Sequence, residues 1–254
     1  MKVIAIVVIY NKKCSESVSL DGLRQYGNDI EVAVFDNSTK DYGNRKYCDK
    51  NGYQYYTMNR NIGLSKAYNY VIEQMRSDYY IILDDDTQLN EEYFKKLKLM
   101  IANLQYDVIL PIVKADNMII SPSIVQFGCR VKRIRDINAV DEKHITAINS
   151  GMIVKKDVYN KIVYDEDLFL DYVDHEFMRE VRKEHFRIKI MKDVVIFQNF
   201  SMLQKKDLKS ERVRFDIYKK DFKEYCKKCN NMLYYYINIW QYSRNLKKKY
   251  GGGR

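Results

Sequence analysis

The stretch YYIILDDDTQL, residues 79–89, carries a run of apolar and aromatic side chains directly into three consecutive aspartates. The run predicts a buried strand over residues 79–84. Three adjacent carboxylates at the end of such a strand repel one another and lose hydration, so folding alone gives no reason for them. The alternative is a solvated turn that caps the next helix, which would explain one aspartate more readily than three. We therefore expect a cation, or a ligand that carries one, at this place.

Short β-branched or aromatic runs alternate with helix-like stretches over residues 1–110. The other runs lie at 2–10, 30–36 and 53–58, and the helix-like stretches lie near 15–27, 41–51, 62–76 and 90–104. This alternation predicts a parallel sheet that helices cover on both faces. Ligands of such sheets bind beyond the carboxyl ends of the strands. The polar residues expected there are Asn11, Asp36, Asn37, Asn59, Asn61 and the three aspartates.

The pattern changes in the second half of the chain. Residues 107–155 are rich in short strands, helices are expected near 156–162 and from 173 to 185, and a strand pair is expected around 187–200. From Lys205 onward the pattern is helical, and one helix face carries Phe215, Tyr218, Phe222 and Tyr225. The predicted fold class is α/β, with a mostly parallel, Rossmann-like sheet flanked by helices and a C-terminal helical appendage.

The net charge of +10 is confined to the end of the chain. Residues 1–204 are balanced, whereas residues 205–254 hold 15 basic and 5 acidic residues. The neutral body argues against nucleic-acid binding, and the basic tail predicts a contact with something anionic. The first apolar run is too short to cross a bilayer, so a cytoplasmic protein is expected. The CKKC stretch at 226–229 lacks a nearby His or a second cysteine pair, which favours reduced thiols over a zinc site.

The aspartate run itself suggests a metal site. Strand alternation would turn Asp84 and Asp86 to one side and Asp85 to the other. Two carboxylates on one side suit a hard divalent ion such as Mn²⁺ or Mg²⁺, which takes oxygen ligands and commonly bridges to phosphates.

Several pieces of the sequence together resemble one family. They are IVVIYN (6–11), VAVFDNS (32–38), NRNIGLSKAYN (59–69), LDDDT (83–87), NSGMIV (149–154) and DEDLFLDYVDHEF (165–177). In these pieces and their order the chain is similar to family 2 nucleotide-sugar glycosyltransferases of the GT-A fold, especially the rhamnosyltransferase-like bacterial enzymes that build surface polysaccharides. The resemblance implies a GT-A catalytic domain over 1–204, with a nucleotide-binding half over about 1–110 and an acceptor half over about 111–204. A basic, aromatic, helical region would follow over 205–254.

The resemblance also implies roles for single residues. It puts Asp36 beside a uracil or thymine base, Asp84 beside the ribose, and Asp86 on a Mn²⁺ or Mg²⁺ ion that holds the diphosphate. Asp174 matches the general base. The remaining implied contacts are to the nucleotide for Asn11, Asn61, Gly63 and Asn69, and on the acceptor side for Ser150, Gly151 and Asp171.

The residues alone leave other interpretations open. Asn61 can be read as a helix N-cap, Gly63 as a helix-start glycine, and Asp171 as the N-cap of the helix that carries Asp174. Glu176 is expected to be structural because it faces away from Asp174. The three histidines, His144, His175 and His185, are also expected to be structural. Many similar enzymes complete the metal shell with a His after the second half of the domain, but residues 193–204 hold none.

The predicted function is inverting transfer of a sugar from a UDP- or dTDP-sugar to a hydroxyl of a lipid-linked glycan acceptor, in bacterial surface polysaccharide synthesis. A non-catalytic nucleotide-sugar or glycan-binding relative is the alternative. A nucleotidyltransferase is disfavoured by the glycine-free loop YNKKCSES at 10–17. The tail would hold the protein at the inner face of the cell membrane through anionic lipid. Alternatively, its aromatic stripe packs on the body or on a second subunit of a homodimer.

Overall fold

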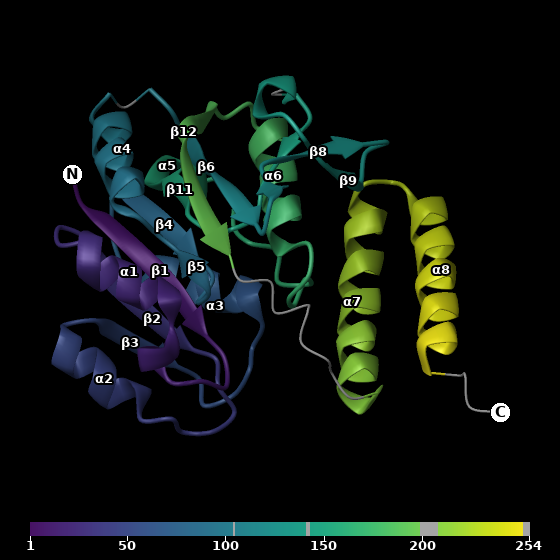
Figure 1. The fold of residues 1–254 in the computed structure, drawn as a ribbon, viewed down its shortest axis with the longest axis horizontal. Helices are drawn as coiled ribbons and strands as arrows, with labels where there is room; N and C mark the ends of the chain where they lie inside the picture. Colours follow the sequence, from purple (N-terminus) through teal and green to yellow (C-terminus); the bar gives the residue numbers. More distant parts are fainter. Residues whose placement is uncertain (104, 141–142, 199–207, 251–254) are drawn as a thin grey trace.

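The computed structural model describes residues 1–250 except 104, 141–142 and 199–207, and Figure 1 shows its fold. The first half confirms the predicted alternation. Its strands are β1 (Val3–Ile9), β2 (Glu31–Asp36), β3 (Gln54–Thr57) and β4 (Tyr79–Leu83), and neighbouring strands among them are parallel. Its helices are η1 (Cys14–Glu16), α1 (Val18–Tyr26), α2 (Asn44–Asn51), α3 (Leu64–Gln74) and α4 (Glu91–Ala102).

The second half extends the same sheet, whose order is β3-β2-β1-β4-β11-β6-β12-β5, with β7 beside β6. β11 (Met152–Lys155) runs antiparallel to both β4 and β6 (Val108–Ala115), whereas β12 (Ile188–Gln198) runs parallel to β6. The end of β12 pairs with β5 (Thr87–Gln88), which directly follows the aspartates. This pairing brings Gln198 to the carboxyl end of β4.

The strand pair predicted around 187–200 is wrong for the described residues, which form the single strand β12. Its register against β6 shifts between Met191 and Val195, and this irregularity breaks the alternation much as a turn would. The small sheet β10-β8-β9 lies apart from the main sheet. The remaining elements are β7 (Met118–Ser121), β8 (Ser123–Gln126), β9 (Arg130–Arg133), η2 (Ile137–Ala139), β10 (Ile145–Thr146), α5 (Lys156–Tyr159) and α6 (Val173–Lys183).

The core lies on both faces of the main sheet. Every residue of β1 is buried, and its side chains alternate between two clusters. Ile6 packs in the cluster that includes side chains of α3 and α6, whereas Val7 packs in the cluster that includes side chains of α1 and α4. A strand covered on both faces is apolar at every position, which explains the uninterrupted run VIAIVVI.

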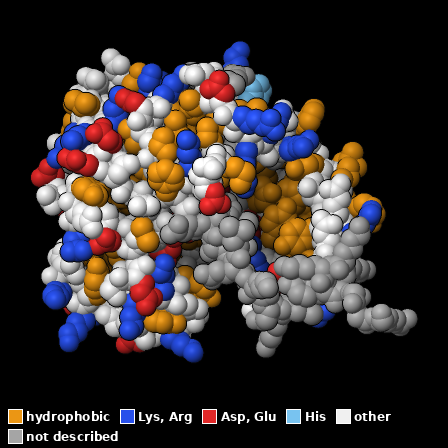
Figure 2. Space-filling view, viewed as in Figure 1, with side chains coloured by type: hydrophobic (Ala, Val, Ile, Leu, Met, Phe, Trp, Pro, Cys, Tyr) orange, Lys and Arg blue, Asp and Glu red, His pale blue; other side chains and the backbone are white. Residues whose placement is uncertain are grey.

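The C-terminal region forms two helices, α7 (Leu208–Lys228) and α8 (Met232–Tyr250), that lie side by side in Figure 1. The predicted aromatic face of α7 exists. Phe222 and Tyr225 stack on Tyr172 of the body, with ring centroids 5.1 and 4.7 Å away, and the ring of Tyr218 lies tilted against it at 6.1 Å. Phe215 instead stacks on Tyr242 of α8, at 4.6 Å. The stripe therefore packs within the chain, and Figure 2 shows hydrophobic side chains in the hollow between the body and these helices.

The predicted division at residue 204 falls in the segment 199–207, which lies outside the described residues. Within the described part of the chain, no helix has both the length and the apolar character that crossing a membrane requires.

Candidate active site

The three aspartates lie at a turn, not in an extended strand. β4 ends at Leu83, and a turn at Asp85 and Asp86 leads into β5. Asp84 and Asp86 nevertheless lie on one side and Asp85 on the other, as expected. The Nε2 atom of Gln198 lies 3.0 Å from Oδ2 of Asp84 and 3.1 Å from Oδ1 of Asp86, so these two carboxylates converge. Asp85 faces elsewhere and forms an ion pair with Lys12 at 3.0 Å.

Serine side chains hold this turn in place. The hydroxyl of Ser150 donates to Oδ2 of Asp84 at 2.7 Å. Ser17 donates to the carbonyl of Asp85 at 2.8 Å, and Ser19 donates to the carbonyls of Asp84 and Thr87. Ser17 and Ser19 come from the start of α1 and were not predicted as site residues. The sequence feature that could have indicated them is the serine-rich stretch at 15–19, which follows the carboxyl end of a parallel strand.

Burial raises the pKa values of the carboxylates at this turn. It raises the pKa of Asp84 to about 7, with the charges of Asp86 and Asp174 adding to the effect and the Ser150 hydrogen bond opposing it. Burial also raises the pKa of Asp86, against the hydrogen bond from Gln198. Two half-buried carboxylates with one shared amide hold excess negative charge, and a bound cation would relieve it.

The residues present fit a hard divalent ion. The Oε1 atom of Gln198 is buried and has no hydrogen-bond partner among the described residues, although its Nε2 lies between two carboxylates. Two carboxylates and an amide oxygen form an oxygen donor set of the kind that Mg²⁺ and Mn²⁺ take. Within the described residues, no group of three or more His, Cys, Asp or Glu side chains could hold a metal. The protein donors would therefore be Asp84, Asp86 and Gln198.

Gln198 is the main residue that sequence reasoning missed. It lies in the segment 193–204, where the absent His was noted, and it ends the run DVVIFQ. Its position follows from the pairing of Gln198 with Thr87 across β12 and β5. An amide at the end of a strand-like run was the available signal, but the pairing partner could not be read from the sequence.

Asp36 ends β2 and is buried. Its carboxylate accepts hydrogen bonds from the amide of Asn44 (2.8 Å), the hydroxyl of Tyr55 (3.0 Å) and the backbone N–H of Ser38 (3.0 Å). Asp36 lines a cavity of about 400 Å³ together with Tyr55 and Arg45, whose guanidinium lies 4.7 Å from the centre of the Tyr55 ring. An aromatic ring beside side chains that can form hydrogen bonds is a suitable site for a nucleotide base.

Asn11 shapes the same region. Its side-chain Oδ1 accepts from the N–H of Thr39 at 3.0 Å and from the Thr39 hydroxyl at 3.1 Å. Its own N–H donates to the Ser38 hydroxyl at 2.8 Å. Asn11 thus fixes the loop after β2, which forms one wall of the cavity.

The piece Asn61 to Asn69 makes protein contacts that the prediction did not include. Gly63 precedes α3 with φ of +86°, and a Cβ there would lie 2.7 Å from the ring and the carbonyl oxygen of Phe169. Gly63, not Asn61, occupies the N-cap, and Asn61 accepts from the Gly63 N–H at 2.9 Å. Asn69 uses both ends of its amide on the backbone of Tyr164. Gly63 and Asn69 therefore lie close against the segment 164–169.

Asp174 lies in the first turn of α6, and its charge contributes to the raised pKa of Asp84, so the two carboxylates belong to one region. Its neighbour His175 is held by Thr146, with 2.8 Å between Nδ1 and the hydroxyl oxygen. Glu176 is buried and forms a two-pronged ion pair with Arg179 at 2.8 and 2.7 Å. The structural interpretation of Glu176 is confirmed.

The three acceptor-side residues lie in different settings. Ser150 contacts Asp84, as described above. Gly151 is buried, with φ of +79°, and an added Cβ would lie 2.8 Å from the side chain of Ile196, so it serves packing. Asp171 is not the N-cap of α6, because Tyr172 occupies that position. Its carboxylate instead forms a two-pronged ion pair with Arg214 of α7.

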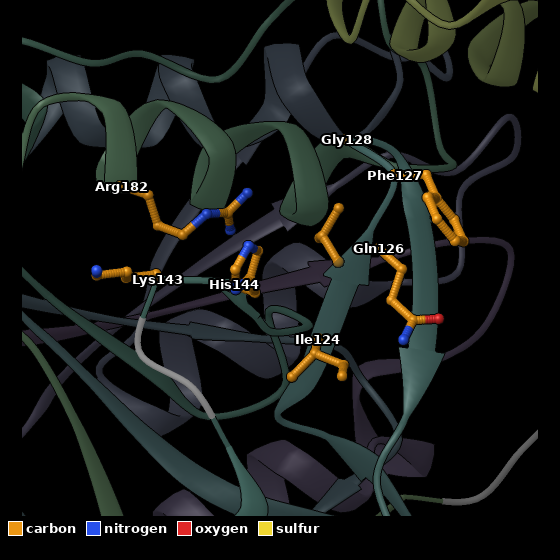
Figure 3. A pocket seen from close by; sticks show the side chains of 8 residues that line it. Ile124, Gln126, Phe127, Gly128, Lys143, His144 and Arg182 are labelled. Atoms are coloured by element: carbon orange, nitrogen blue, oxygen red, sulfur yellow. The ribbon is translucent and has the colours of Figure 1, made fainter.

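A larger cavity, of about 630 Å³, lies between β8 and α6 (Figure 3). Arg182 of α6 and His144 point into it, and Arg182 also donates to the carbonyl of Ile145. None of the predicted site residues lines this cavity.

The fold that carries these residues is the GT-A fold of glycosyltransferases. The crystal structure of S. aureus TarS 1–349 in complex with UDP-GlcNAc matches with a TM-score of 0.63 at 19% identity, covering 90% of this chain and 65% of that one. The mannosyltransferase PcManGT from Pyrobaculum calidifontis, in complex with GDP-Man and Mn²⁺, matches with a TM-score of 0.62 at 16% identity, covering 89% and 64%. At these identities the likeness shows the fold alone.

Residues 4–163 match the family model of glycosyl transferase family 2, and the chain belongs to that family. It is 27% identical over 197 residues to the dTDP-rhamnosyl transferase RfbF of Shigella flexneri, which covers 75% of this chain and 66% of that protein. The chain spans about two thirds or less of the length of each of these relatives. The predicted family and fold are confirmed.

Proposed function

We propose that the chain is a metal-dependent, inverting glycosyltransferase that moves a sugar from a UDP- or dTDP-sugar to a hydroxyl of a glycan acceptor. The observation that carries the proposal is the convergence of Asp84, Asp86 and Gln198 at the carboxyl end of β4. Family membership, the dTDP-rhamnosyl transferase activity named for the relative, and the UDP-GlcNAc, GDP-Man and Mn²⁺ in the structural neighbours support it.

Asp84, Asp86 and Oε1 of Gln198 would hold Mn²⁺ or Mg²⁺. Such an ion supplies positive charge that offsets the charge developing on a leaving diphosphate. Ser150 keeps Asp84 oriented, and Lys12 keeps Asp85 away from the other two carboxylates.

The donor nucleotide would bind beside these carboxylates. Its base would occupy the cavity lined by Asp36, Tyr55 and Arg45, and Asn11 would hold the wall of that cavity. Asp84 would contact the ribose. The contacts of Gly63 and Asn69 with segment 164–169 suggest that these two residues act on the shape of the site, not on the nucleotide directly.

Asp174 would act as the general base. It would accept the proton of the acceptor hydroxyl while the hydroxyl oxygen bonds to the anomeric carbon and the bond from that carbon to the diphosphate breaks. Attack on the face opposite the leaving group inverts the configuration. A positioned carboxylate base typically contributes ~10²–10⁴-fold to the rate.

The acceptor would be a lipid-linked glycan of a bacterial surface polysaccharide, and the C-terminal helices would bring the enzyme to an anionic membrane face. Residues 205–254 hold the whole net charge. In α8 the exposed side chains Leu233, Tyr236, Ile237 and Trp240 share one helix face, with exposed fractions of 72, 62, 46 and 61%. Aromatic and apolar side chains next to basic ones favour the surface of an anionic bilayer.

The function is tested by incubating the protein with a panel of UDP- and dTDP-sugars, with and without Mn²⁺, and measuring sugar transfer and hydrolysis. Asp174→Asn keeps the side-chain shape and removes proton acceptance, so we expect turnover at least ~10²-fold lower with donor binding nearly unchanged. Asp167→Asn, an exposed carboxylate of the loop before α6, is the matched control. Donor binding without transfer or hydrolysis by the unmodified protein would instead indicate a non-catalytic relative.

A further inference from the structure

The loop that leads into α6 is built around a carboxylate from α7. Asp221 is fully buried and accepts hydrogen bonds from three consecutive backbone N–H groups. Its Oδ1 lies 3.0 Å from the nitrogen of Phe169, and its Oδ2 lies 2.7 and 2.8 Å from those of Leu170 and Asp171. Three successive N–H groups that point at one anion fix the backbone that carries them, because charge-assisted bonds are short and strong.

Other side chains of α7 hold the same loop. Arg214 forms a two-pronged ion pair with Asp171, and Lys228 pairs with Asp165 at 2.5 Å. On α7, Tyr225 lies between Arg214 and Lys228 in the sequence, and its ring stacks on that of Tyr172. The contacts span the loop from Asp165 to the start of α6, so α7 acts on most of the loop.

The opposite side of the loop touches the donor half of the site. The N–H of Leu64, at the start of α3, donates to the carbonyl of Phe169 at 2.7 Å, and the hydroxyl of Ser65 donates to the carbonyl of Leu168 at 2.6 Å. The loop is therefore held between α3 and α7.

Asp174 follows this loop directly. Tyr172 has φ of +62°, and α6 begins at the next residue, so the backbone at 171–172 sets the direction in which the first turn of α6 carries Asp174. A non-glycine residue persists in this region only when its surroundings hold it there. The surroundings are the stacked aromatic rings and the carboxylate of Asp221.

We propose that Asp221 is a positioning residue for the reaction: it holds Asp174 in place through the N–H groups of 169–171. The proposal rests on the proposed function, in which Asp174 is the base. It makes the C-terminal helices part of the catalytic unit in addition to any role at a membrane.

The test compares Asp221→Asn with Glu224→Gln, which removes a carboxylate one turn away on α7 whose partner is Lys227. Asn cannot accept at both side-chain positions, so the loop loses part of its anchor. Because a displacement of about 1 Å can cost ~10²-fold, we expect turnover to fall ~10²-fold in Asp221→Asn, with donor-dependent thermal stabilisation unchanged. Glu224→Gln should stay within about twofold of the unmodified protein.

A purely structural role would also lower turnover, so a double variant distinguishes the two. If Asp221 acts through Asp174, Asp174→Asn combined with Asp221→Asn is no slower than Asp174→Asn alone. Additive losses, or equal losses of turnover and donor binding, overturn the proposal. Arg214→Gln, at a less buried side chain, provides a milder second variant with the same expected pattern.

Amide hydrogen exchange tests the anchor without any substrate. The N–H groups of Phe169, Leu170 and Asp171 should exchange faster in Asp221→Asn than in Glu224→Gln. Unchanged exchange at these three amides overturns the proposal. Failure of the unmodified protein to transfer sugar from any donor overturns the proposed function instead, and the exchange result remains a separate outcome.

Discussion

The side-chain nitrogen of Gln198 lies 3.0 Å from Oδ2 of Asp84, although the two residues are 114 positions apart in the chain. The contact exists because β12 runs past β6 and pairs its last residues with β5, immediately after the aspartate turn. An amide therefore lies beside the aspartates at the end of a segment, 193–198, that contains no His. The amide of Gln198 thereby links the carboxylates of Asp84 and Asp86.

Gln198→Ala should weaken metal-dependent donor binding, because it removes one oxygen donor and the hydrogen bonds that orient both carboxylates. We expect Mn²⁺ affinity to fall by ~10–100-fold, the usual range for groups that orient metal ligands. Thermal stabilisation by Mn²⁺ with UDP or dTDP, titrated in metal, measures the change. Gln88→Ala, an exposed amide on the neighbouring strand β5, is the control. Unchanged metal affinity in Gln198→Ala would exclude it from the site.

The three aspartates should differ in their importance for the metal. Asp86→Ala should abolish metal-dependent donor binding and Asp84→Ala should weaken it, because both carboxylates converge on Gln198. Asp85→Ala should matter less, since its side chain pairs with Lys12. Calorimetric titration of Mn²⁺ and nucleotide into each variant gives the order. If Asp85 were the most sensitive of the three, this arrangement of the turn would be wrong.

Stability without metal should fall as the pH rises through about 7. Burial raises the pKa of Asp84 from 3.8 to about 7, so the folded state holds a proton that the unfolded state releases. The stability this contributes is fully present below the ordinary pKa, falls by up to about 1.4 kcal/mol per pH unit as the pH rises from there, and levels off above about 7. Thermal unfolding in EDTA between pH 5 and 8 measures the loss. Asp84→Asn should flatten this part of the profile, and an equally steep profile in that variant would contradict the assignment.

The protein should bind liposomes that contain anionic lipid at low salt and release them as salt is raised, because exposed charges are screened. Replacing Leu233 and Trp240 together by Ser removes two of the four exposed apolar or aromatic side chains on this face of α8 and should reduce flotation. Neutralising Lys247, Lys248 and Lys249 together with the basic residues between 205 and 228 should reduce it further. Neutral liposomes are the control. An unmodified protein that stays unbound to anionic liposomes at low salt would contradict the proposed membrane contact of α8.

Much of the fold could be predicted from local patterns. The apolar runs of β1, β2 and β4 are buried on both faces, and such strands must be apolar at every position whatever their neighbours are. The helical stripe at Tyr218, Phe222 and Tyr225 was equally readable, because a period of 3.6 residues is a property of the segment itself. The strand pair around 187–200 failed for the same reason: a bulge and a turn both interrupt the pattern, and local sequence does not separate them.

The sequence by itself determined the family and the fold class, and it predicted Asp36, Asp84, Asp86 and Asp174 as site residues, because strand ends and short motifs are local. Only the tertiary structure decided how those carboxylates are surrounded. It brought Gln198 to Asp84, turned Asp171 toward Arg214, and placed Asp221 under the loop before Asp174. These contacts join residues tens of positions apart, and they depend on which strands pair and which helix covers a loop. That choice is made by the free energy of the whole packed chain, so no single segment encodes it.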